Sequence, residues 1–416
     1  MNRCLLPFLT FLFLVPACNP AFIEDEDLLL RLMQNEPLKF RYILEHSDSL
    51  EVQLLYTQIN WDSNNRPVFK SFYFQTDSTQ YFYPASTVKL PLVLLSLEKL
   101  NDLKIKGLDK FTPVFHDSVY SGQRSVRKDT TSENGLPSIA HYAKKILLLS
   151  DNDASNCLYE FIGQKAANDQ LHKKGYHIRL LHRLSRAASF DENRHTEAIR
   201  FVKNDTLIYH QPMLVNRDSI LQPAKILKGK GYLENGKIIP EPFDFTYKNS
   251  YPLQEQQEIL KAIVFPQSVM PAKRFNLTSD DRQFLLQYMS QRPRETLYPS
   301  YKNDTSIHDS SGKWLMYAGD HGSIPKNIRI FNKIGGAYGY LIDNAFIVDF
   351  ENGVAFFLSA VINTNLDGIY NDDLYEYNSI GYPFMKNIGQ TIYHYELNRK
   401  RDPKPDLREF KLRYDE

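Results

Sequence analysis

Apolar residues in the first quarter of the chain gather in runs with different spacings. Residues 51–60 and 67–76 are rich in Val, Leu, Tyr and Phe, and the turn-forming sequence 62–65 separates them, which predicts a β-hairpin. The segment 27–45 carries apolar residues at helical intervals and predicts one helix or two short ones. An apolar run from residue 86 to about residue 100 predicts a further helix.

The middle of the chain has helical patterns, and its last third returns to strands. Helical spacing or helix caps occur in three segments: 134–149, 153–163 and 278–288. Strand patterns occupy three more segments: 328–334, 339–349 and 354–363. A last helix ends near residue 393. Strands at both ends with helices between them predict an α+β fold, in which one sheet is assembled from both termini beside a helical subdomain.

Two regions are less regular. Residues 201–276 have a mixed pattern with one short strand candidate at 206–210. Residues 396–416 are charged and contain proline, so we expect a solvated C-terminal tail.

The first residues have the pattern of an export signal. Arg3 precedes a short apolar run, and small residues lead to Cys18. The run is too short to span a membrane permanently. The sequence 14–18 resembles a bacterial lipobox, whose cysteine becomes the lipidated first residue. The resemblance implies a signal peptide at 1–17, a spacer with helices at 18–50, and a lipid anchor in the bacterial cell envelope. The alternative is an ordinary signal peptide that happens to contain a cysteine.

Composition narrows the possible partners and cofactors. The 50 basic residues against 49 acidic ones leave no basic surplus for nucleic acid. Eleven histidines are scattered without ligand spacing, so we expect no metal and no other cofactor. Cys157 lies in an apolar helical stretch, where it is expected to be a small core residue. We expect a monomer.

Ser86 and Lys89 are the first candidate catalytic pair. Residues three apart share one helix face, and a buried, neutral lysine can activate a serine hydroxyl. The Ser-x-x-Lys pattern occurs five times, but only Ser86 follows an aromatic segment and precedes an apolar helix. A helix start at Ser86 would also favour an oxyanion. The alternative role of Ser86 is that of a helix N-cap.

Two further motifs follow in a fixed order. Ser150-Asp151-Asn152 lies between two helical segments, where Ser150 could relay a proton and Asn152 could bind a substrate amide; simple turn chemistry is the alternative. Lys333-Ile334-Gly335-Gly336 ends a strand. Its glycines let another backbone approach, and the N–H groups of Gly336 and Ser86 could form an oxyanion hole. The alternative is an edge strand guarded by a lysine.

Together the three motifs resemble those of class A β-lactamase-type serine hydrolases, a family shared with penicillin-binding D-Ala-D-Ala peptidases. The flanking sequences 82–91, 150–156 and 333–346 are also similar. The resemblance implies a three-layer α/β/α fold, with a catalytic domain at 51–395. By the same resemblance Ser86 is acylated, Lys89 is its base and Ser150 is a relay. Asn152, Lys333, Gly335 and Gly336 then bind a β-lactam or a peptidoglycan stem peptide.

The sequence departs from the family pattern in three places. Ile334 stands where the family has Thr or Ser, so a hydroxyl that binds the substrate carboxylate is missing. No Glu with Asn four residues later occurs in 183–197, where class A enzymes carry their deacylating base; Asp191 and Glu192 are the nearest candidates. Ser150 and Lys333 are 183 residues apart, more than the family needs, which predicts an insertion at about 201–276.

Three functions remain open from the sequence. The first is a hydrolase of β-lactam or related amide bonds. The second is a D-Ala-D-Ala carboxypeptidase or penicillin-binding protein with slow deacylation, which the missing glutamate favours. The third is a binding protein on the same fold that has lost turnover.

Overall fold

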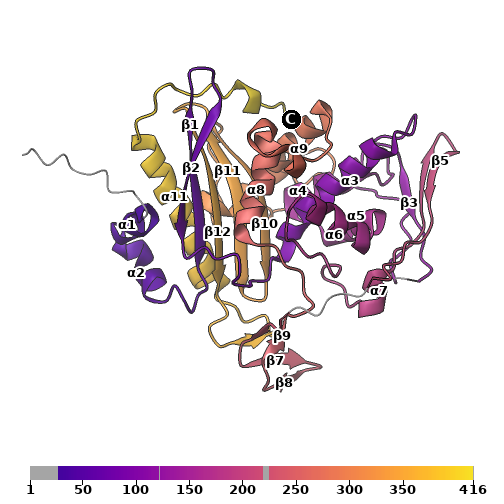
Figure 1. Cartoon of the computed structure of the whole chain (residues 1–416), viewed down its shortest axis with the longest axis horizontal. Helices are drawn as coiled ribbons and strands as arrows, with labels where there is room; N and C mark the ends of the chain where they lie inside the picture. Colours follow the sequence, from indigo (N-terminus) through magenta and orange to yellow (C-terminus); the bar gives the residue numbers. More distant parts are fainter. Residues whose placement is uncertain (1–26, 121, 219–223, 416) are drawn as a thin grey trace, which may run out of the picture.

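A five-stranded antiparallel sheet forms the centre of the computed structural model, which describes residues 27–120, 122–218 and 224–415 (Figure 1). The strand order is β10-β11-β12-β1-β2. The strands are β1 (Gln53–Trp61), β2 (Pro67–Phe74), β10 (Ile328–Ala337), β11 (Tyr340–Asp349) and β12 (Val354–Asn363). β1 pairs with β12, with Leu54 opposite Ala360. This pairing joins the two ends of the chain and confirms the predicted α+β fold.

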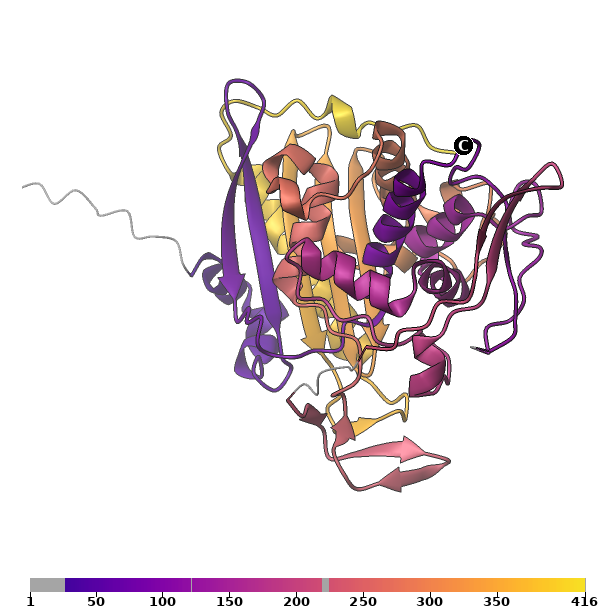
Figure 2. The same ribbon diagram turned by 45° about the vertical axis from the view of Figure 1, so that its right-hand side comes forward.

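Helices cover both faces of the sheet, which gives three layers (Figures 1 and 2). One face packs against α1 (Leu28–Gln34), α2 (Pro37–Glu45) and α11 (Tyr382–Asn398). The other packs against α8 (Leu253–Val264) and α9 (Ser279–Ser290), which lie next to the helical subdomain. Every residue of β11 and β12 is buried, as expected for strands covered on both sides.

The helical subdomain supplies one wall of the candidate site. It contains α3 (Lys89–Leu103), α4 (Ile139–Leu149), α5 (Asn152–Ile162) and α6 (Gln164–Lys173). Beside it lie α7 (Phe190–Arg194) and a three-stranded sheet of β3 (Val114–His116), β4 (Ile199–Lys203) and β5 (Thr206–Gln211). Below the central sheet in Figure 1 lie β6 (Leu227–Lys228), β7 (Gly231–Glu234), β8 (Lys237–Ile239), β9 (Phe243–Asp244) and β13 (Ile369–Tyr370). A short turn, α10 (Trp314–Tyr317), precedes β10.

Local sequence explains several element boundaries. Pro37 occupies the first turn of α2 and separates it from α1, since proline starts helices well and interrupts them inside. Thr278 caps α9 in a capping box with Asp281.

The predicted hairpin, the three predicted C-terminal strands and the predicted helices are all present. In the described part of the chain, no helix is long and apolar enough to cross a membrane. The predictions on residues 1–17 and Cys18 lie outside the described residues.

The segment 201–276, predicted as an insertion, is not one separate unit. Its helix α8 packs directly on the central sheet, and Gln257 is buried there. The Gln257 amide nitrogen donates to the Leu55 carbonyl (3.0 Å) and Ser359 Oγ (3.0 Å), and its oxygen accepts from Thr57 Oγ1 (2.6 Å). α8 is therefore part of the core, and the additional material is confined to the segment before it.

The prediction of a solvated C-terminal tail is wrong. Leu407 and Phe410 are 5% and 1% exposed, and both belong to the main apolar core. The Phe410 ring centroid lies 4.9 Å from that of Phe346 and 5.6 Å from that of Phe265. The two apolar residues are enough to dock a segment whose other residues are mostly charged.

We expect Phe410→Ala to lower the free energy of unfolding by about 3–5 kcal/mol, because it leaves a cavity among aromatic rings. Chemical denaturation followed by circular dichroism measures this change. Lys404→Ala, on the same segment but exposed, is the control and should stay within about 0.5 kcal/mol. A loss below about 1 kcal/mol for Phe410→Ala would show that the segment is not anchored in the core.

Candidate active site

Ser86 lies in a tight turn that connects the segment before it to α3. Residues Ala85–Val88 form a 3-10 turn, and α3 begins only at Lys89. Ala85 has a φ of +48°, a left-handed conformation that costs a non-glycine residue about 1 kcal/mol or more. The Thr87 hydroxyl and N–H both donate to the Pro84 carbonyl (2.7 and 3.1 Å). The turn keeps Ser86 partly exposed while its neighbours are buried.

Strand β10 passes very close to this turn. A Cβ atom at Gly335 would lie 2.8 Å from the Pro84 carbonyl oxygen and 3.0 Å from the Ser86 nitrogen. Only glycine fits this approach. Gly335 thus brings the end of β10 against the Ser86 turn, and the predicted role of the motif glycines in a close backbone approach agrees with this geometry.

The Lys89 amine is buried behind Ser86. The residue is 0% exposed, and its Nζ donates to Asn152 Oδ1 (2.6 Å), Ser150 Oγ (3.2 Å) and the Ser150 carbonyl. Burial lowers the pKa of Lys89 to about 7, against the opposing effect of the Asp151 carboxylate. At neutral pH the amine is therefore available as a base.

A second buried amine meets the same serine. Lys333 Nζ donates to Ser150 Oγ (2.8 Å) and to the Ile334 carbonyl (2.7 Å). Burial, and next the charge of Lys89, lower the pKa of Lys333 well below its usual value. Ser150 has a φ of +62° at the C-terminus of α4, and its hydroxyl lies between the two amines.

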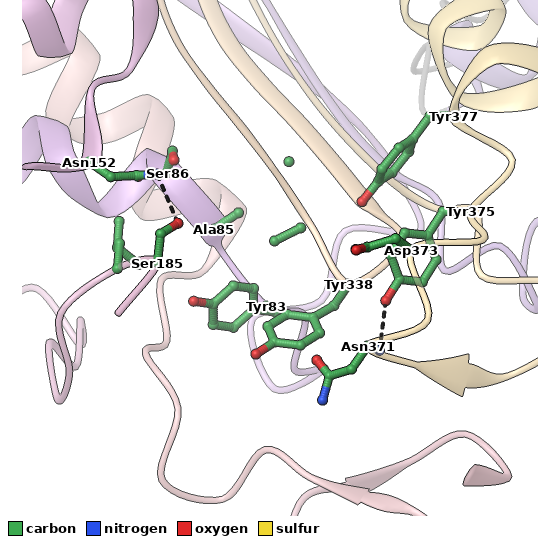
Figure 3. Close-up of a pocket in the computed structure, with 13 residues that line it drawn as sticks. Tyr83, Ala85, Ser86, Asn152, Ser185, Tyr338, Asn371, Asp373, Tyr375 and Tyr377 are labelled. Atoms are coloured by element: carbon green, nitrogen blue, oxygen red, sulfur yellow. Dashed lines mark hydrogen bonds between the residues drawn. The ribbon is translucent and has the colours of Figure 1, made fainter. Parts of the chain in front are cut away.

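The predicted residues meet at one cavity of about 500 Å³ (Figure 3). Ser86, Asn152 and Gly336 line it, whereas Lys89, Ser150 and Lys333 lie behind its wall. Asn152 Nδ2 donates to Ser185 Oγ (2.8 Å), which also faces the cavity. Ser86 Oγ forms no hydrogen bond with any described residue, so Lys89 contacts Ser150 and not Ser86.

The two acidic candidates for the deacylating base are not at the cavity. Asp191 accepts a hydrogen bond from the Tyr120 hydroxyl, and Glu192 accepts one from the Ser189 N–H (2.6 Å) within the capping box of α7. Neither lines the cavity, which contradicts the prediction that either activates water there.

Sequence reasoning missed most of the remaining lining. Those residues include Ser185, Asp373 and four tyrosines: Tyr83, Tyr338, Tyr375 and Tyr377. Tyr338 follows the Lys-Ile-Gly-Gly motif almost directly and Tyr83 lies three residues before Ser86, so their positions beside two motifs were the available signals. Asp373 and Tyr375 come from an irregular loop after β13, and Tyr377 begins the short π-helix Tyr377–Gly381 that follows it. In the part of the chain that the structure describes, no group of three His, Cys, Asp or Glu side chains could hold a metal ion.

Comparison with known proteins adds a family match. The model of the β-lactamase enzyme family matches residues 46–231, just under half of the chain. No curated protein sequence matches the chain.

Solved structures show distant similarity. A β-lactamase from Xanthomonas campestris is 14% identical with a TM-score of 0.44, over 88% of this chain and 98% of that one. A class A β-lactamase from Clostridium kluyveri is 14% identical with a TM-score of 0.46, over 86% and 98%. PBP-A in an acyl-enzyme complex with penicillin G is 15% identical with a TM-score of 0.45, over 88% and 96%.

The matched segment contains the Ser86–Lys89 and Ser150–Asn152 motifs and the two helices that carry them. This confirms the resemblance that the motifs indicate. Residues 46–231 are thus similar to the β-lactamase enzyme family.

Proposed function

We propose that this protein is a serine hydrolase whose Ser86 is acylated by substrates that contain a β-lactam or a related amide bond. The observation that carries the proposal is the arrangement around Ser150, whose hydroxyl oxygen accepts hydrogen bonds from the amines of Lys89 and Lys333. The same residues lie beside a cavity into which Ser86 opens. The match to the β-lactamase enzyme family supports this chemistry.

The proposed acylation uses Lys89 as the base. Its amine donates to Ser150 before the substrate binds. In the proposed step the neutral amine takes the Ser86 hydroxyl proton as Oγ attacks the substrate carbonyl carbon. The N–H groups of Ser86 and Gly336 stabilise the oxyanion. The carbonyl C–N bond then breaks, and the proton passes from Lys89 through Ser150 to the leaving nitrogen. The product is an ester at Ser86. The new amine stays tethered to the acyl group when the substrate is a β-lactam, and it leaves as a separate molecule when the substrate is an open-chain amide.

We propose slow deacylation, which corresponds to the penicillin-binding alternative. Hydrolysis of the ester needs a group that activates water, and the acidic candidates Asp191 and Glu192 lie away from the cavity. Ile334 also offers no hydroxyl to a substrate carboxylate, and a lost hydrogen bond to a charged group costs about 1.5–3 kcal/mol. The missing base favours a long-lived acyl-enzyme over rapid β-lactam turnover, and the missing hydroxyl weakens the binding of carboxylated β-lactams.

The test is covalent labelling by a fluorescent penicillin. We expect the purified protein to form an adduct at Ser86 that persists for minutes or longer, and we expect Ser86→Ala to abolish it. Ser323→Ala is the matched control, because Ser323 lies in another Ser-x-x-Lys sequence and is exposed. Mass spectrometry of the labelled peptide locates the adduct.

The other outcomes separate the alternatives. Rapid nitrocefin hydrolysis without a stable adduct would favour an efficient β-lactamase. A folded protein that forms no adduct and hydrolyses no substrate would be the binding protein, and the catalytic proposal would be wrong.

The labelling rate should rise with pH and be half-maximal near pH 7. The cause is the Lys89 pKa of about 7, since only the neutral amine accepts the Ser86 proton, and its population grows as pH increases through that value. Labelling reactions that are stopped after fixed times between about pH 5.5 and pH 8.5 measure how the rate depends on pH. A rate that stays flat or falls across this range would exclude Lys89 as the base.

We also propose that Cys18 anchors the protein to the cell envelope by a lipid, as its lipobox-like sequence indicates. When the full chain is expressed in a bacterium, Cys18→Ala should move it from the membrane fraction to the soluble fraction. Cys4→Ala, within the same leader, should leave the distribution unchanged. Equal membrane association of the two variants would contradict the anchor.

A further inference from the structure

The wall of the cavity away from Ser86 is built largely of tyrosines (Figure 3). Tyr83 lies just before the nucleophile turn and Tyr338 just after β10. Their ring centroids are 4.9 Å apart with planes at 86°. Tyr375 lies in the loop after β13 and Tyr377 at the start of the helix that follows, and their ring centroids are 5.4 Å apart. Four aromatic side chains from three separate segments therefore converge on one side of the cavity.

The phenols of this wall carry no charge at neutral pH. Burial raises the pKa of all four tyrosines above its usual value. The Tyr375 and Tyr377 hydroxyl oxygens accept hydrogen bonds from the N–H groups of Asn371 and Gly339 (both 3.0 Å). The rings are thus held in place by the backbone. Neutral aromatic rings present faces of negative potential, which attract organic cations.

Asp373 adds a formal negative charge to the same wall. It is exposed and lines the cavity beside Tyr375 and Tyr377 (Figure 3). Its charge contributes to the raised pKa of both tyrosines. Among the described residues, no lysine, arginine or histidine lines the cavity, and Asp373 is the one carboxylate that does.

The basic groups close to this wall do not oppose Asp373 inside the cavity. His182 stacks on Tyr83 with centroids 6.1 Å apart, but burial lowers the His182 pKa to about 4, so the ring is neutral. Lys248 lies 6.0 Å from the Tyr338 centroid and 5.5 Å from that of Phe243, and it does not line the cavity. The amines of Lys89 and Lys333 are directed to Ser150.

We propose that Asp373 and the four tyrosines form a subsite for a positively charged group of the substrate, such as a primary ammonium. The inference rests on the proposed function, because the subsite and Ser86 line one cavity. A cavity of about 500 Å³ has room for a cationic group and the scissile amide of the same molecule. The selectivity is for cationic over anionic substrates at this position.

Binding of two matched small ligands tests the subsite without any acylation. Phenethylamine and 3-phenylpropionate share a phenyl ring and a two-carbon spacer and differ in the sign of their charge. Titrated into Ser86→Ala protein and followed by NMR, the amine should bind about ten-fold more tightly than the carboxylate, as an exposed ion pair and a cation–π contact together imply. Asp373→Asn should lower the amine affinity about three- to five-fold and should not weaken the carboxylate.

Asp372→Asn is the control, because Asp372 precedes Asp373 and does not line the cavity. Its Oδ1 accepts a hydrogen bond from the Leu374 N–H (3.1 Å), which asparagine can also accept. Equal affinities for the two ligands, tighter binding of the carboxylate, no binding of the amine, or equal effects of the two variants would each overturn the subsite. Failure of penicillin labelling would overturn the proposed function instead and would leave the result on the subsite standing.

Discussion

Two buried amines that share one hydroxyl are the constraint around which the site is organised. Lys89 and Lys333 both donate to Ser150 Oγ and are almost fully buried. Two ammonium ions that contact the same hydroxyl repel one another, and the protein interior solvates neither of them well. Burial lowers the pKa of both amines, and the charge of Lys89 lowers that of Lys333 further. At neutral pH the pair binds fewer than two protons, which leaves it able to accept one from a nucleophile.

The fold brings these groups together from distant parts of the sequence. Lys333 is delivered by β10, whose approach to the nucleophile turn depends on Gly335. β10 is itself fixed from behind, where Lys313 Nζ donates to Asn332 Oδ1 (2.8 Å) and the Asn332 amide donates to Asp343 Oδ1 (2.8 Å). Because these groups are buried and paired, a shift of β10 would leave them without partners. The sheet therefore fixes the position of Lys333.

Sequence analysis predicted the parts of the molecule in which a functional motif lies in a segment with a clear helix, strand or turn pattern. Ser86, Asn152 and Gly336 line one cavity as expected, because short motifs fix local geometry. Helix α8 was missed because its inward face carries Gln257, whose partners lie on distant strands. The docking of Phe410 was missed because a charged segment needs few apolar residues to pack. The loop with Asp373 has no periodicity, so nothing local places it at the cavity.

Two features of the site act on substrate charge in the same direction. Ile334 offers no hydroxyl to a substrate carboxylate, and Asp373 places a negative charge in the cavity, across from Ser86 (Figure 3). The lysine that the family uses for the carboxylate is here directed to Ser150 and to the Ile334 carbonyl. A lost hydrogen bond to a charged group costs about 1.5–3 kcal/mol, and a nearby like charge adds to that cost. We therefore expect an anionic group to bind less well in this cavity than a cationic one, whereas the residues proposed for acylation remain in contact around Ser150.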